Sequence, residues 1–184
     1  MEAVRARALV LDACSLLNLV ASRRFTDIAR AISVQLLTTP IVAAEVLYVR
    51  KGGGSGELEN VDLRSLQVAG HLSVVALETP NEQATFVSLA VELDDGEAEA
   101  SALAIHRGGA LVTDDRAARR VLRQRDPEFP LMTTSEVIKE WSDQVVLNAR
   151  DLARVLIDVE ERARFRPHRG DPLLAWWDAA RSQD

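Results

Sequence analysis

Short apolar runs alternate along this chain with segments whose apolar residues recur at helical spacing. The run 7–11 closes on Asp12, and apolar residues then follow at 16, 17, 20 and 21, as on one face of a helix. Further strands are predicted at 34–39, 72–77, 110–113 and 129–133, and helices at 25–32, 62–70, 80–93, 94–107, 116–125 and 135–142. This alternation favours an α/β three-layer sandwich with a mainly parallel central sheet.

Two stretches are less regular. Thr39 and Pro40 occupy the N-cap and first-turn positions of a helix that the spacing extends to Val49. The glycine-rich residues 51–60 predict a mobile loop. Beyond about residue 145 only helical spacing remains, so we expect a domain over residues 1–144 and a helical C-terminal extension over residues 145–184.

Composition narrows the class of protein. With 184 residues and 47% hydrophobic content, the chain can bury one good core. It contains no apolar run long enough for a membrane span, so no membrane partner is expected, and its single cysteine predicts a reducing cytoplasm. The net charge of −6 argues against a general nucleic-acid binder, unless bound divalent cations supply the positive charge.

Carboxylates follow two of the predicted strands directly. Asp12 comes after the run 7–11, and Asp114 and Asp115 come after 110–113. In an open α/β sheet the reactive groups collect beyond the carboxyl ends of the strands, so these side chains share one edge if the two strands are neighbours. The alternative is that each aspartate only caps the helix that follows it.

Two glutamates are expected on inner faces of helices. Glu45 falls in the apolar stripe of its predicted helix, with Tyr48 and Val49 among its neighbours, where a carboxylate needs a cation or an arginine partner. The alternative places Glu45 at the edge of the stripe, in contact with solvent. Glu97 begins a face of small residues that would let its helix approach the sheet closely, although acidic first turns also occur simply because they suit the helix dipole.

Carboxylates that converge without basic partners repel each other, and hard divalent cations relieve that repulsion. An oxygen-only site disfavours zinc and favours Mg²⁺ or Mn²⁺. The chemistry expected of such a site is phosphodiester hydrolysis by metal-activated water, without a covalent intermediate.

Four segments, LVLDACSLLNL, PIVAAEVLY, LDDGEAEASALA and LVTDDRAARRV, resemble in this order the acidic blocks of the PIN-domain ribonucleases, which include VapC-like toxins. The resemblance covers about residues 7–140. It implies an endoribonuclease that uses Mg²⁺ or Mn²⁺, with an antitoxin protein as partner if the chain is a toxin. It also implies metal-binding and catalytic roles for Asp12, Glu45, Glu97 and Asp115, an alternate ligand in Asp114, and substrate contacts by Thr113 and Asn18.

The chain departs from the family pattern at Cys14, where relatives often carry Ser or Thr two residues after the first aspartate. We expect Cys14 to be a small buried side chain, since no base to activate its thiol is evident. Its position also disfavours a covalent-aspartate phosphatase, which needs a second aspartate there.

Arginines line one face of the helix that follows Asp115. Arg116, Arg119, Arg120 and Arg123 recur at helical spacing and would repel each other without a negative partner. RNA phosphates are the partner we expect, and ion pairs within the protein are the alternative.

The C-terminal aromatic residues and the question of turnover are two points that bear on partners. The aromatic cluster in residues 173–180 either packs on its own domain or mediates a homodimer or antitoxin contact. A binding or scaffold module that keeps the fold but lacks turnover remains the alternative to the nuclease.

Overall fold

A computed structural model describes residues 7–53 and 56–183 of the chain. Its central sheet has five parallel strands in the order β5-β2-β1-β6-β7, and β1 pairs with β6 through Leu11 and Val112. The strands are β1 (Ala8–Leu11), β2 (Gln35–Thr38), β5 (Ser73–Val74), β6 (Ala110–Val112) and β7 (Leu131–Met132). The predicted α/β fold with a parallel central sheet is confirmed, while the strands expected at 72–77 and 129–133 are shorter than predicted.

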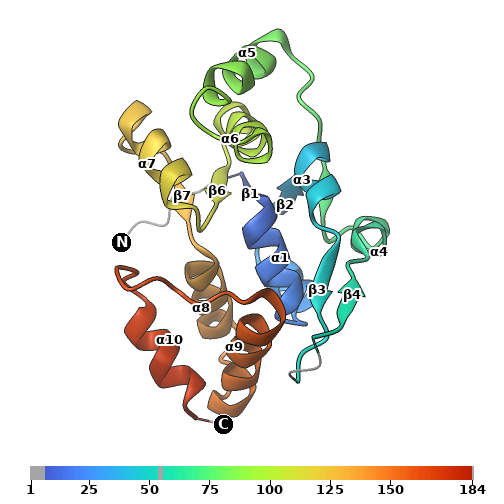
Figure 1. Cartoon of the computed structure of the whole chain (residues 1–184), viewed down its shortest axis with the longest axis vertical. Helices are drawn as coiled ribbons and strands as arrows, with labels where there is room; N and C mark the ends of the chain where they lie inside the picture. Colours follow the sequence, from blue (N-terminus) through green and yellow to red (C-terminus); the bar gives the residue numbers. More distant parts are fainter. Residues whose placement is uncertain (1–6, 54–55, 184) are drawn as a thin grey trace.

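Helices cover both faces of the sheet. The helices are α1 (Ala13–Ala21), α2 (Phe25–Ala31), α3 (Pro40–Glu45), α4 (Leu63–Val68), α5 (Pro80–Leu89), α6 (Asp95–Arg107), α7 (Arg116–Arg125), α8 (Thr134–Gln144), α9 (Ala149–Ala163) and α10 (Leu174–Arg181). Figure 1 shows α5 and α6 on one side of the sheet and α1, α8, α9 and α10 on the other. Strands β1 and β6 are buried throughout because helices cover both of their faces.

Local sequence signals set the ends of several helices. Thr79 and Thr133 each form a capping box with the glutamate three residues later, at the starts of α5 and α8. Gly108 ends α6 in the left-handed region at φ 62°, where an L side chain would be strained. The predicted boundaries of α7 agree with the structure, those of α6 agree to within one residue, and those of α8 agree to within two.

The region after β2 differs from the prediction. Helix α3 ends at Glu45, and Tyr48 and Val49 belong instead to strand β3 (Tyr48–Arg50), so the helix expected to reach Val49 is wrong. Strand β3 pairs antiparallel with β4 (Leu58–Asn60), which lies within the segment expected to be a loop. Tyr48, Val49 and the Val46–Leu47 pair before them are β-branched or bulky residues that suit a strand, and pairing with β4 outweighs the apolar spacing that suggested a helix.

The C-terminal helices share the core of the molecule. Leu156 and Val159 of α9 and Trp177 of α10 belong to the same buried cluster as strand β1. Trp177 is fully buried, so its part of the aromatic cluster packs on its own chain. The domain boundary at residue 144 stays a prediction. None of the helices in the described ranges combines the length and apolar character that crossing a bilayer requires.

Candidate active site at the carboxyl edge of the sheet

The order of the strands brings Asp12 close to the aspartates after β6. β1 and β6 are parallel neighbours, and the N–H of Asp12 donates to the carbonyl of Val112 at 3.2 Å. Asp12 therefore leaves β1 at the edge where Thr113, Asp114 and Asp115 leave β6. The shared edge was predicted on the condition that the two strands are neighbours, and the structure meets that condition.

Asp12 is buried and caps helix α1. One of its carboxylate oxygens, Oδ1, accepts the N–H of Ser15 at 2.7 Å. Burial raises the pKa of Asp12 to about 6, while the hydroxyl of Thr113 and the Ser15 N–H partly oppose that rise and Asp114 adds to it. Asp12 can therefore cap α1 and also take part in the site. The cap holds the carboxylate in place, and burial makes its negative charge costly.

Asp115, like Asp12, both caps a helix and belongs to the site. Its Oδ1 accepts the N–H groups of Ala117 and Ala118 at 2.6 and 2.8 Å and so caps α7. Its own N–H donates to Oγ1 of Thr113 at 3.1 Å. With that oxygen occupied as an acceptor, the hydroxyl proton of Thr113 is free to turn toward Asp12. Thr113 therefore links the two capping aspartates.

Asp114 is held from several directions. Its carboxylate accepts the amide of Asn18 at 3.0 Å and the backbone N–H of Thr134 at 2.9 Å, and the Thr134 hydroxyl donates to it as well. The pKa of Asp114 is raised because burial outweighs these hydrogen bonds. Asp114 and Asn18 thus tie the start of α8 to α1 beneath the site, a positioning arrangement in which Thr134 was not foreseen from the sequence.

Glu97 completes the group from the first turn of α6. It is half-buried, and its pKa is raised to about 7 by burial and by the negative charges of Asp115, Asp94 and Asp12, in that order. Glu97 therefore stands near the aspartates from both strands. Repulsion among carboxylates from three elements, expected from the sequence, is a property of this site.

Glu45 lies beside this group. It is exposed, so the expected burial in an apolar stripe is wrong and the alternative at the stripe's edge is correct. Its carboxylate faces the first turn of α6, where a Cβ added to Gly96 would meet its Oε2 at 2.9 Å. The pKa of Glu45 is raised by desolvation and then by Asp94, Asp95 and Glu99, not by the aspartates of the strand ends.

Glu99 was missed as a structural residue. It is buried, and its Oε2 accepts the N–H of Ile41 at 3.1 Å in the first turn of α3. This bond ties α3 to α6 and so helps to place Glu45 beside Gly96. A sequence signal was present, because Glu99 stands between two alanines. Its place near the acidic start of α6 was instead explained by the helix dipole alone.

The arginines of α7 divide into two kinds. Arg119 donates to the carbonyls of Thr113 and Met132 at 3.3 and 3.1 Å, and Arg123 donates to the carbonyl of Pro127. Within the described part of the chain, Arg116 and Arg120 are exposed and form no hydrogen bond or ion pair. None of the four arginines forms an ion pair with a described carboxylate, so the alternative of internal ion pairs is wrong; two of them bind backbone carbonyls.

Cys14 is exposed, so the expectation of a buried side chain is wrong. Its pKa is raised to about 11 by desolvation and by four surrounding carboxylates, which leaves the thiol protonated and inert at neutral pH. The next residue, Ser15, is fully buried instead, and its hydroxyl is among the groups that lower the pKa of Asp12. Ser15 supplies a hydroxyl beside Asp12, displaced by one residue from the place where the family pattern has it.

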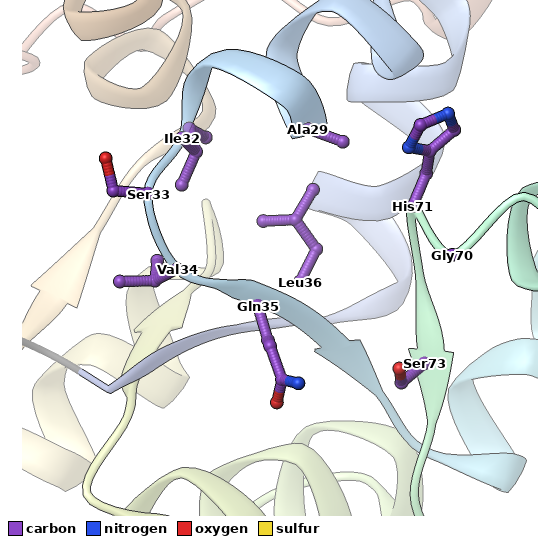
Figure 2. Close-up of a pocket in the computed structure, with 9 residues that line it drawn as sticks. All are labelled: Ala29, Ile32, Ser33, Val34, Gln35, Leu36, Gly70, His71 and Ser73. Atoms are coloured by element: carbon purple, nitrogen blue, oxygen red, sulfur yellow. The ribbon is translucent and has the colours of Figure 1, made fainter.

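A cleft of about 360 Å³ opens next to these carboxylates. Asp114 and Asp115 line it together with Arg116 and Arg119, and residues 163–168 form the facing wall. A separate cavity of about 300 Å³ lies at the opposite edge, where β2 and β5 begin (Figure 2). His71 contributes the one titratable side chain among the residues that line it, so the carboxylate edge is the better place for hydrolytic chemistry.

The donor set suits a hard cation. Asp12, Glu97, Asp115 and the Ser15 hydroxyl offer oxygen atoms only. In the described ranges no three His, Cys, Asp or Glu side chains are arranged to hold an ion directly. Mg²⁺ commonly contacts only one or two carboxylates and keeps several of its waters, so its binding does not require three side chains on the ion.

A parallel α/β sheet with carboxylates at its carboxyl edge defines the class of protein, and the comparison with known families agrees. Residues 8–158 match the family model of the PIN domain. The chain therefore belongs to the PIN-domain family, as its acidic blocks suggested. PIN domains are generally nucleases and generally use divalent metal ions. A search among curated proteins finds none that matches the chain.

Proposed function

We propose that this protein is a metal-dependent endoribonuclease that hydrolyses RNA phosphodiester bonds. The observation that carries the proposal is the meeting of Asp12, Glu97 and Asp115 from three elements. The pKa of Asp12 and of Glu97 is raised, and no arginine or lysine among the described residues is paired with the three carboxylates. Structural carboxylates are normally paired when buried, whereas this group keeps its repulsion. A cation site explains that arrangement.

Asp12, Glu97 and Asp115 would hold the Mg²⁺ or Mn²⁺, with Glu45 at the rim. The bound ion supplies a water of lowered pKa and charge stabilisation for in-line displacement at phosphorus. The capping bonds of Asp12 and Asp115 use one oxygen of each carboxylate, Oδ1, so the second oxygen is not needed for the caps. Thr113 keeps the two aspartates in register, and Asp114 with Asn18 supports them from below.

Arg116 would orient the substrate. It lies on the cleft wall next to Asp115 and has no hydrogen bond or ion pair among the described residues, so its guanidinium is available to a phosphate oxygen. Arg120 is equally available one turn further along α7. Arg119 and Arg123, which we expected in the same role, are bound to backbone carbonyls and support the ends of α7 instead.

The experiment compares cleavage of single-stranded RNA with Mg²⁺ or Mn²⁺ and with EDTA. The wild type should cut only with the metal, and Asp12→Asn and Glu97→Gln should each lose about 100-fold or more in kcat, the equivalent of a few kcal/mol. Glu128→Gln, which removes an exposed carboxylate just before β7, at the opposite edge of the sheet from the site, is the matched control and should cut normally. Equal cleavage by all three variants would overturn the proposal.

Two other outcomes identify the rivals. RNA binding without cleavage under any metal condition would favour a binding or scaffold module. Faster hydrolysis of a small phosphate ester than of RNA would favour a phosphatase.

The toxin role, with an antitoxin partner in the cytoplasm, is proposed from the family resemblance. Growth arrest on expression in a bacterial host, relieved by Asp12→Asn, is the test.

A further inference from the structure

The segment 164–171, here called the strap, links α9 to α10 and lies beyond the residues that match the family (Figure 1). Its residues form one wall of the cleft, while Asp114, Asp115 and Arg116 line the other. The strap is therefore a part of the site's surroundings that lies outside the family match and that the nuclease proposal has not used.

The strap is held firmly at both ends. Near its start, the ring of Phe165 meets Trp177 edge to face at 5.7 Å, and Arg166 forms an ion pair with Asp178 at 2.7 Å. At its end, the buried Asp171 accepts the hydroxyl of Ser135 at 3.2 Å, from the first turn of α8. A wall held in this way can present side chains to a ligand without first losing much conformational freedom.

Two polar groups on the strap remain available. Arg164 forms no hydrogen bond or ion pair with any described residue, and it ends α9 in the left-handed region at φ 57°. The Nδ1 atom of His168 accepts the N–H of Gly170 at 2.9 Å, so the neutral ring carries its proton on Nε2. Arg166, by contrast, is occupied by Asp178.

These groups complement Arg116 on the opposite wall. A polyanion that reaches the carboxylates must pass a repulsive charge, and cations on both walls of the approach offset that repulsion. Arg164 also borders a second cleft of about 370 Å³, which is lined by Arg50, Gly52 and Gly56 of the β3–β4 hairpin and by Glu160 and Glu161 of α9. The carboxylate of Glu160 is paired with Arg181, and that of Glu161 accepts the N–H of Gly53. Arg164 thus stands between the acidic edge and a further stretch of surface, as a contact along an extended ligand would.

We propose that the strap binds the backbone of single-stranded RNA beside the cleavage site, with Arg164 contacting a phosphate and His168 donating from Nε2. This inference rests on the proposed function. It adds a second wall to the substrate site and gives the C-terminal extension a role in affinity.

The test measures binding of a short single-stranded RNA by fluorescence anisotropy over a range of salt concentrations in EDTA, because the metal-activated water proposed above would otherwise cleave the probe. Arg164→Ala should weaken binding roughly three- to tenfold and reduce the slope of log K against log salt by about 0.7, the value for one lost phosphate contact on a single strand. Arg164→Lys should keep most of the slope. Arg169→Ala removes the same charge from the exposed surface of the strap outside the cleft and is the matched control.

Cleavage kinetics supply the second measurement. Arg164→Ala should raise KM with little change in kcat, because a contact to a phosphate that does not react stabilises substrate and transition state alike. Equal salt slopes for the wild type, Arg164→Ala and Arg169→Ala would overturn the role of the strap while cleavage by the wild type leaves the nuclease proposal standing. Tighter binding by Arg164→Ala would also overturn it and would show that the strap obstructs the cleft. Absence of both binding and cleavage in the wild type would overturn both proposals.

Discussion

Replacing Asp12 with asparagine should stabilise the metal-free protein at neutral pH while it abolishes cleavage. Asparagine keeps an oxygen for the Ser15 N–H, so the cap of α1 is preserved, but it removes the buried charge. Burial raises the pKa of Asp12 from 3.8 to about 6, so the folded protein holds this proton to a higher pH than the unfolded chain does. Stability is therefore lost as the pH rises between these two values.

The magnitude follows from the two pKa values. At about 1.4 kcal/mol for each pKa unit, a charged Asp12 costs the fold about 3 kcal/mol above pH 6, and nothing below about pH 4. Urea denaturation in EDTA should show Asp12→Asn more stable than the wild type by up to about 3 kcal/mol at pH 8, with the difference vanishing near pH 4.

Divalent cations and a control variant sharpen this prediction. Mg²⁺ at about 100 times its Kd should stabilise the wild type by about 2.7 kcal/mol and Asp12→Asn by much less. Glu128→Gln should unfold like the wild type at both pH values. A variant less stable than the wild type at pH 8, or a difference that does not change with pH, would refute the reasoning that a buried, unpaired charge sits at this strand end.

Substitutions at three further positions and one pH titration test other parts of the arrangement. Gly96→Ala should keep or slightly raise stability, because alanine favours the helix by about 0.5–1 kcal/mol, but it should lower activity by displacing the carboxylate of Glu45; unchanged turnover would exclude Glu45 from the site. Arg119→Ala should cost about 2 kcal/mol in urea unfolding, since two backbone carbonyls lose a charged donor. Arg162→Ala should cost about 3 kcal/mol and Arg162→Met less, because this buried guanidinium donates to two carbonyls and a glutamate. Cleavage at limiting Mg²⁺ should rise with pH through about 7 as Glu97 ionises, and a flat profile would contradict its part in holding the ion.

Much of the fold could be predicted because its signals are local. The apolar runs around Val10 and Leu111 mark buried strands, and the threonine and glutamate pairs at the starts of α5 and α8 mark helix ends. Errors arose where a short apolar segment suits either kind of element. Tyr48 and Val49 continue the spacing of α3, yet they pair with a strand that the sequence does not indicate.

The sequence indicated the acidic residues of the candidate site, but not the hydrogen-bond partners or the burial of the residues around them. The aspartates after two strands and Glu97 could be identified by their positions in the sequence. The hydrogen-bond partners of Arg119 and Arg123 could not be predicted, since the carbonyls that bind them come from turns and strand ends that meet only in the folded chain. The exposure of Cys14 and the burial of Ser15 likewise depend on which face of α1 the helices α8 and α9 cover.

By itself the sequence determined the alternation of strands and helices, the acidic blocks of a PIN domain and the caps that begin its helices, because these depend on neighbours a few residues apart. The tertiary structure alone decided that β1 lies between β2 and β6, which places Asp12 beside aspartates about a hundred residues away. It also decided how deeply each carboxylate is buried, and hence which pKa values rise. Strand order and burial result from packing among distant segments, and periodicity along the chain carries no record of that packing.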